Sequence, residues 1–156
     1  MIRIAQYKGK SLTSKIIKFK TRGVYSHTAI MLDDNKIVEA WQGSNEVRII
    51  ESLSDGHKPG TEVDIYYLDA TQSQQVLFVE FVMEQLGKKY DYLGILGFVF
   101  NRNFHGQDSW FCSELFMAAC VYAGIVVLKN TESWQASPSL ITKSPKLYRV
   151  ESLVTV

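Results

Sequence analysis

Cysteine and long apolar runs are both scarce in this sequence, and each scarcity excludes a class of protein. Two cysteines, Cys112 and Cys120, are too few for a disulfide framework. If both lie on one helix, they are about 12 Å apart along its axis, which is beyond disulfide reach. No apolar run reaches the roughly 18–20 residues that a membrane-spanning helix needs, so we expect no transmembrane segment.

Histidine is also rare, and its placement argues against a metal centre. His27, His57 and His105 show no metal-ligand spacing with one another or with the cysteines, so we predict no metal site and no cofactor. The N-terminus lacks the positive region and apolar stretch of a secretory signal peptide, which makes the cytoplasm the expected location. Length, 46% hydrophobic content and 21% charged content predict one globular domain over residues 1–156.

Acidic residues are missing from the first 32 positions. This segment carries +7 and the remainder −6, although the whole chain has a net charge of only +1. The basic residues are Arg3, Lys8, Lys10, Lys15, Lys18, Lys20 and Arg22. A solvated surface would account for them without any function. The alternative is a surface through residues 8–22 that contacts an anionic partner, such as lipid headgroups or cell-wall polymer; we do not expect nucleic acid.

Hydrophobic periodicity predicts strands in the first half of the chain and helices mainly in the second. Strands are expected at Ile2–Tyr7, His27–Leu32, Ile37–Trp41, Val47–Ile50, Glu62–Leu68 and Lys146–Val154. Helices are expected from Ser11 to about Lys20, from Thr71 to Gly87, over Tyr92–Phe100 and from Cys112 to Gly124. This segregation predicts an α+β fold with an antiparallel sheet.

Cys112 is the candidate nucleophile. We expect it in the first turn of a helix that follows the Asn101–Asp108 loop, with Ser109 as the N-cap. The free N–H groups and the positive dipole end of a helix favour the thiolate, which is the nucleophilic form. A small buried hydrophobe is the alternative for any helical cysteine, and Cys120 fits that alternative.

His27 is the candidate base for this thiol. It opens an apolar strand, and Glu39 lies in the other strand of the expected hairpin, where an unpaired carboxylate would be costly. A carboxylate that accepts a hydrogen bond from Nδ1–H would orient the ring and leave Nε2 facing the thiol. The two side chains share a face only if an odd number of residues separates their paired positions. We therefore predict a three-residue loop or a bulge, and not a two-residue turn at Asp34-Asn35.

Two histidines and two tyrosines are further candidates. His105 competes as the base because it is only seven residues before Cys112, but residues just before a helix usually point away from its first turn. His57 is the weaker competitor. Tyr90 and Tyr25 can bind substrate through a phenol or can simply pack. The backbone N–H of Cys112 is the more dependable donor to an oxyanion.

Four short motifs follow one another in the chain. They are Tyr25-Ser26-His27-Thr28-Ala29-Ile30, Ile37-Val38-Glu39-Ala40, Gly87-Lys88-Lys89-Tyr90-Asp91 and Trp110-Phe111-Cys112-Ser113-Glu114-Leu115. Their order resembles that of permuted papain-like cysteine hydrolases of the YiiX/YaeF type, relatives of the NlpC-type cell-wall peptidases. The resemblance implies a papain-like, circularly permuted core in which an antiparallel sheet or barrel packs against helices. It also implies that Cys112 at a helix N-terminus is the nucleophile, His27 the base and Glu39 the orienting residue.

Three functions remain open at this point. The first is a cysteine-dependent amidase or peptidase that forms an acyl-thioester on Cys112, with cell-wall-type or other small peptides as the substrates that the resemblance suggests. The second is a lipid acyl hydrolase or acyltransferase at an anionic membrane, which a basic helix bearing Leu12, Ile16 and Phe19 would support. The third is a binding module without catalysis, against which the intact Cys, His and Glu set argues. Many relatives are exported or lipid-anchored, whereas the absence of such signals here suits a phage-borne or otherwise cytoplasmic protein.

Overall fold

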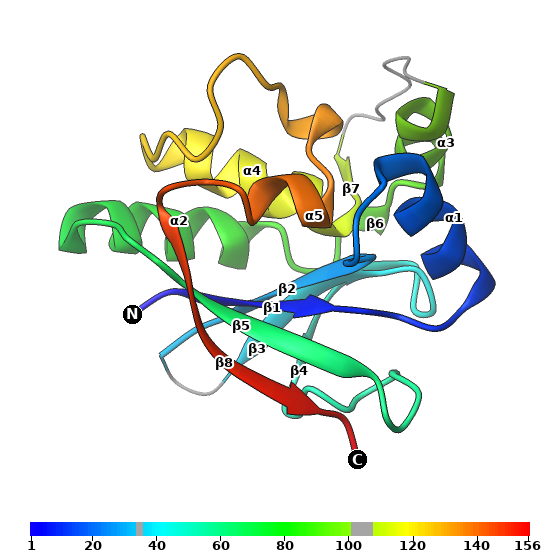
Figure 1. Cartoon of the computed structure of the whole chain (residues 1–156). Helices are drawn as coiled ribbons and strands as arrows, with labels where there is room; N and C mark the ends of the chain where they lie inside the picture. Colours follow the sequence, from blue (N-terminus) through cyan, green and yellow to red (C-terminus); the bar gives the residue numbers. More distant parts are fainter. Residues whose placement is uncertain (34–35, 101–107) are drawn as a thin grey trace.

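An eight-stranded sheet lies beneath a layer of helices in the computed structural model, which describes residues 1–33, 36–100 and 108–156 (Figure 1). The described strands are β1 (Arg3–Tyr7), β2 (His27–Met31), β3 (Ile37–Trp41), β4 (Glu46–Ile50), β5 (Glu62–Leu68), β6 (Lys89–Tyr90), β7 (Ser109–Trp110) and β8 (Leu147–Val154). Their order across the sheet is β7-β6-β4-β3-β2-β1-β5-β8. Every neighbouring pair is antiparallel except β6 and β7, which confirms the predicted α+β class.

Helices pack on one face of this sheet and at one end of it. The described helices are α1 (Leu12–Thr21), α2 (Gln72–Glu84), α3 (Tyr92–Phe100), α4 (Cys112–Tyr122) and α5 (Pro138–Ile141), with a 3₁₀ turn at Ser133–Gln135. Helices α2, α4 and α5 lie over the sheet, whereas α1 and α3 both lie on the right of the view (Figure 1). Phe78 of α2 meets Phe116 of α4, with ring centroids 5.9 Å apart. Among the residues described, none of the helices combines the length and the apolarity that crossing a bilayer requires.

The β2–β3 register brings His27 and Glu39 to the same face of the sheet. Met31 pairs with Ile37, and the Leu32 N–H donates to the Lys36 carbonyl. Three residues, 33–35, therefore separate Leu32 from Lys36, which is the odd number that the sequence argument required. Because side chains alternate along a strand, the odd-numbered residues of both strands point to one side.

Two apolar clusters hold the sheet, one on each face. The larger cluster lies between the sheet and the helices and contains both Phe78 and Phe116. The smaller cluster lies inside the curl of the sheet and consists of Ala5, Tyr7, Ala29, Ile37, Ile50, Val63 and Ile65. His27 and Glu39 point to this second side, beside Tyr7. The candidate site therefore sits where the interior of the curled sheet meets the start of α4.

Local signals explain most helix ends. Thr71 caps α2, its side chain accepting from the Gln74 N–H while the Gln74 side chain accepts from the Thr71 N–H, as predicted. Gly87 ends the following turn at a φ of 77°, where a side chain would be strained. The sequence missed β6, β7 and α5, because elements of two to four residues are too short to show a hydrophobic period.

Candidate active site

Cys112 is the first residue of α4, and strand β7 delivers the chain directly to it. The N-cap is Phe111, with extended φ and ψ of −102° and 166°. The prediction of Ser109 as the N-cap is wrong, because Ser109 belongs to β7 and pairs with Lys89. The capping acceptor is instead a residue within the helix: a carboxyl oxygen of Glu114 accepts a hydrogen bond from the Phe111 N–H at 3.3 Å.

The thiol of Cys112 and the ring of His27 form a hydrogen-bonded pair with opposite pKa shifts. Burial alone would raise the pKa of Cys112, but the charge of His27, the hydrogen bond to it, and backbone hydrogen bonds from Thr28 and Ser113 bring the net pKa below its ordinary value. Burial would likewise lower the pKa of His27, yet Cys112 and Glu39 together raise it to about 10. Both shifts favour the thiolate–imidazolium form of the pair.

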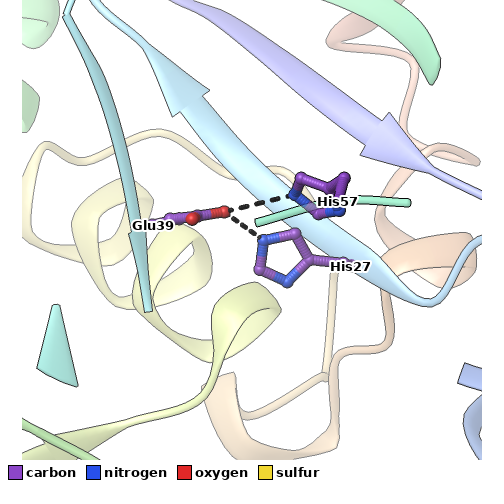
Figure 2. Close-up of side chains that lie close together, drawn as sticks. All are labelled: His27, Glu39 and His57. Atoms are coloured by element: carbon purple, nitrogen blue, oxygen red, sulfur yellow. Dashed lines mark hydrogen bonds and ion pairs between the residues drawn. The ribbon is translucent and has the colours of Figure 1, made fainter. Parts of the chain in front are cut away.

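Glu39 holds the other side of the His27 ring. Its Oε2 lies 2.6 Å from Nε2 of His27 (Figure 2). The prediction that the carboxylate accepts from Nδ1–H and that Nε2 faces the thiol is wrong. His27 is the first residue of β2, and its Nε2 faces Glu39 on β3, which leaves Nδ1 as the ring nitrogen available to Cys112.

Arg48 completes the support of Glu39 from the next strand. Glu39 pairs with Arg48 across β3 and β4, and the guanidinium donates to Oε1 through Nε at 3.0 Å and through Nη2 at 2.7 Å. The same guanidinium lies over the Trp41 ring, 4.9 Å from its centroid. Burial would raise the pKa of Glu39, but His27, His57 and Arg48 hold it far below its ordinary value. The carboxylate is charged, fully buried and oriented by two elements.

His57 is a site residue that the sequence argument ranked low. Its Nε2 lies 3.7 Å from Oε2 of Glu39, the same oxygen that His27 contacts (Figure 2). Its ring stacks on Tyr7 with centroids 3.8 Å apart. This nitrogen is buried and has no hydrogen-bond partner among the described residues. Burial lowers the pKa of His57, so the ring is neutral near pH 7. Because His57 comes from the irregular loop between β4 and β5, no periodicity could have placed it here.

The two tyrosines have different surroundings. Tyr90 lines the cavity beside His27, and burial followed by the nearby Cys112 raises its pKa. Tyr25 does not line that cavity: its hydroxyl donates to Asp64 and lies 3.0 Å from the Tyr66 hydroxyl. The structure therefore keeps Tyr90 near the candidate nucleophile and assigns Tyr25 to a separate polar cluster on β5. His105 and the rest of the Asn101–Gln107 segment lie outside the described residues.

A cavity of about 210 Å³ opens beside the two histidines. Its lining comes from β1, α1, β3 and the β4–β5 loop, and includes Ser14, Ile17, Trp41 and Gln42. Lys10 and Lys58 supply positive charge, and no aspartate or glutamate is among its described lining residues. Cys112 is 6% exposed and is not among the described lining residues of this cavity, whereas Cys120 is fully buried within α4.

His27, Glu39 and His57 together could offer three metal-ligand atoms, all within 4.8 Å of one another. The chain spacing that argued against a metal site did not foresee this cluster, because His57 arrives through a long-range contact. The geometry is nevertheless that of an ion pair. A tetrahedral zinc site with bonds of about 2.0–2.1 Å separates its ligand atoms by about 3.3 Å. The 2.6 Å between His27 and Glu39 is too short for both to ligate one ion without moving apart.

A curled antiparallel sheet that carries a histidine, facing a helix that begins with a cysteine, is the arrangement of papain-like hydrolases. The chain belongs to the family described as permuted papain-like amidases of the YaeF/YiiX type, C92, which matches residues 4–149. The fold is also that of a crystal structure described as the metalloprotein yiiX from Escherichia coli O157:H7, with a TM-score of 0.66 and 17% identity over 96% of this chain and 94% of that one. A search of curated proteins found no significant match.

Proposed function

We propose that this protein is a cysteine-dependent amidase or peptidase that acts through an acyl-thioester on Cys112. The single observation that carries the proposal is the continuous chain of contacts from Cys112 through His27 and Glu39 to Arg48. Each partner in this chain stabilises the charged form of its neighbour. The result is a thiol prepared for nucleophilic attack.

In the proposed reaction the Cys112 thiolate attacks the carbonyl carbon of an amide, and the carbonyl oxygen takes up the negative charge. The backbone N–H of Cys112, in the first turn of α4, donates to that oxygen. His27 then gives its proton to the leaving amine as the C–N bond breaks, leaving a thioester. The neutral ring next takes a proton from water, hydroxide attacks the thioester, and the acid product leaves as the thiolate re-forms.

The charge of the cavity supports an anionic substrate. Lys10 and Lys58 line it, and its described lining contains no carboxylate to repel a negative group. A small peptide with a free carboxylate, as in cell-wall-type peptides, matches this charge. His57 presents a neutral imidazole to the same space.

The relative described as a metalloprotein raises the question of a metal in this site. His27, Glu39 and His57 would be the ligands, but their present arrangement does not fit one. Besides the short separation, His27 is protonated near pH 7 because its pKa is raised to about 10, and a proton on Nε2 blocks ligation. We therefore assign no step of the reaction to a metal.

A second candidate function uses the same Cys112, His27 and Glu39 on a lipid acyl group. The exposed apolar side chains on α1, beside the cavity, favour it. Matched amide and ester substrates with the same acyl chain would separate the two candidates. When the acyl chain of the substrate is shortened, an amidase of small peptides should keep its relative rates on the amide and the ester. A lipid acyl hydrolase should lose most of its rate.

The activated thiol can be tested by measuring iodoacetamide alkylation against pH in a Cys120→Ala background. We expect Cys112 to react at a lower pH than an ordinary thiol, because its pKa is lowered by His27. His27→Ala should move the midpoint of reactivity upward by at least one pH unit and abolish amide hydrolysis.

His105→Ala is the matched control, because it removes the other histidine that competed for the role of base. It should leave the alkylation profile unchanged. The proposal would be overturned if Cys112 were alkylated slowly, with the pH dependence of an ordinary thiol, and if His27→Ala left that dependence unchanged.

A further inference from the structure

Three apolar side chains on α1 point away from the protein. Leu12, Ile16 and Phe19 are 75%, 50% and 88% exposed, and we call them the α1 stripe. They share one face because they are spaced at i, i+4 and i+7. Within α1, which is described throughout, Ile17 alone is buried. An amphipathic helix normally turns its apolar face to the core, whereas α1 buries one residue and presents its stripe outward.

Basic residues surround the α1 stripe. Lys15, Lys20 and Arg22 are exposed, and none of them takes part in an ion pair between described residues. Helix α1 contains no acidic residue. The charge distinguishes this surface from α2, where Val76 and Leu77 are also exposed but the charged residues are acidic. Exposed apolar groups beside unpaired positive charge are the features of a helix that lies on an anionic bilayer.

The opposite side of α1 lines the cavity to which His27 and His57 also contribute. Ser14 and Ile17 contribute to its wall, and Ser11 at the N-cap does the same. The start of α3 adds a second exposed apolar group close by, because the Tyr92 hydroxyl donates to the carbonyl of Gln42, which also lines the cavity. A surface that contacts the α1 stripe would therefore be separated from the cavity by this one helix.

We propose that α1 docks this protein on an anionic phospholipid bilayer, with the α1 stripe inserted between the headgroups and its basic residues against the phosphates. The active-site cavity then lies on the other side of α1 from the membrane surface, one helix away from it. Docking needs no chemistry at Cys112. The docking proposal can therefore be tested independently of the proposed hydrolase activity.

The test is sedimentation of the full chain carrying Cys112→Ala with vesicles of phosphatidylglycerol and phosphatidylcholine, or of phosphatidylcholine alone. We expect binding to the phosphatidylglycerol vesicles that weakens with added salt. The triple variant Leu12→Ser, Ile16→Ser, Phe19→Ser should lower the partition coefficient at least about tenfold. Neutralising Lys15, Lys20 and Arg22 to glutamine should have a similar effect.

The pair Val76→Ser and Leu77→Ser on α2 is the matched control, and it should leave binding unchanged. Circular dichroism melts should be the same for all variants, since every substituted side chain is exposed. Equal binding to both kinds of vesicle, or no binding to either, would overturn the proposal. So would binding that the charge variant removes and the serine variant does not, because that result identifies a polyanion site without membrane insertion.

Discussion

Individual side chains at the candidate site act mainly by setting one another's charge. Arg48 and Glu39 are fixed on adjacent strands, so the carboxylate cannot turn away from His27. The imidazolium in turn favours the Cys112 thiolate. Removing the charge of Glu39 should therefore raise the pKa of the Cys112 thiol, although Glu39 is not among the lining residues of the cavity.

Glu39→Gln tests this coupling directly. The amide keeps the volume but not the charge, so the pKa of His27 should fall and the ion pair with Cys112 should weaken. We expect kcat/KM to drop by up to about 10⁴-fold, the loss that follows when the orienting carboxylate of a serine-protease triad becomes an amide. The pH midpoint of Cys112 alkylation should rise in the same variant.

Glu62→Gln, an exposed carboxylate paired with Lys8, is the control and should leave both measurements unchanged. An unaltered kcat/KM in Glu39→Gln would show that His27 is oriented without the carboxylate.

The start of α4 illustrates what a single element contributes. Burial, followed by the nearby charge of Asp91, raises the pKa of Glu114 to about 8, although the Phe111 N–H opposes that shift. Glu114 is therefore largely neutral near pH 7. A neutral side chain two positions after Cys112 closes the helix end and places no second negative charge beside the thiolate.

This raised pKa makes a prediction for stability. Glu114 binds a proton in the folded protein up to about pH 8 but releases it near its ordinary pKa when unfolded, so its contribution to stability falls as the pH rises between those values. Glu114→Gln keeps the capping acceptor and removes this titration. The variant should therefore gain stability relative to the unaltered protein, by about 1–3 kcal/mol at pH 8.

Denaturant unfolding at pH 5 and pH 8 measures the difference. The gain should be smaller at pH 5, and a gain that does not depend on pH would contradict the assignment.

The molecule as a whole places the thiol and the imidazole on separate layers. Cys112 belongs to the helical layer and His27 to the sheet, so the site exists only while α4 stays docked. Phe116 and Phe78 are central to that docking, since both are fully buried between α2, α4 and the sheet. The stability of this interlayer core and the integrity of the site should therefore be linked.

Phe116→Ala should lower the free energy of unfolding by about 3–5 kcal/mol, because it leaves a cavity in a close-packed core. Val121→Ala, at an exposed position of the same helix, should change it by less than about 1 kcal/mol. Thermal and urea unfolding measure both. At temperatures where the Phe116 variant is still folded, the pH profile of Cys112 alkylation should be preserved; a shifted profile would mean that the core also tunes the thiol.

Local patterns were enough to predict the long strands and helices and the likeness to a permuted papain-like family. Alternation along β2 and β3 and the capping box at Thr71 are properties of neighbouring residues, so they can be read without the fold. The need for an odd loop between His27 and Glu39 followed from strand geometry in the same way, and the register satisfies it.

Other features depend on how distant segments pack and could not be read from the chain. Which nitrogen of His27 faces Glu39 depends on the curl of the sheet, and the presence of His57 beside them depends on a loop folded back over Tyr7. The exposure of Leu12, Ile16 and Phe19 also depends on tertiary packing, since periodicity defines one face of a helix but not what that face contacts. Sequence patterns record contacts within an element, whereas these contacts join elements that only the folded chain brings together.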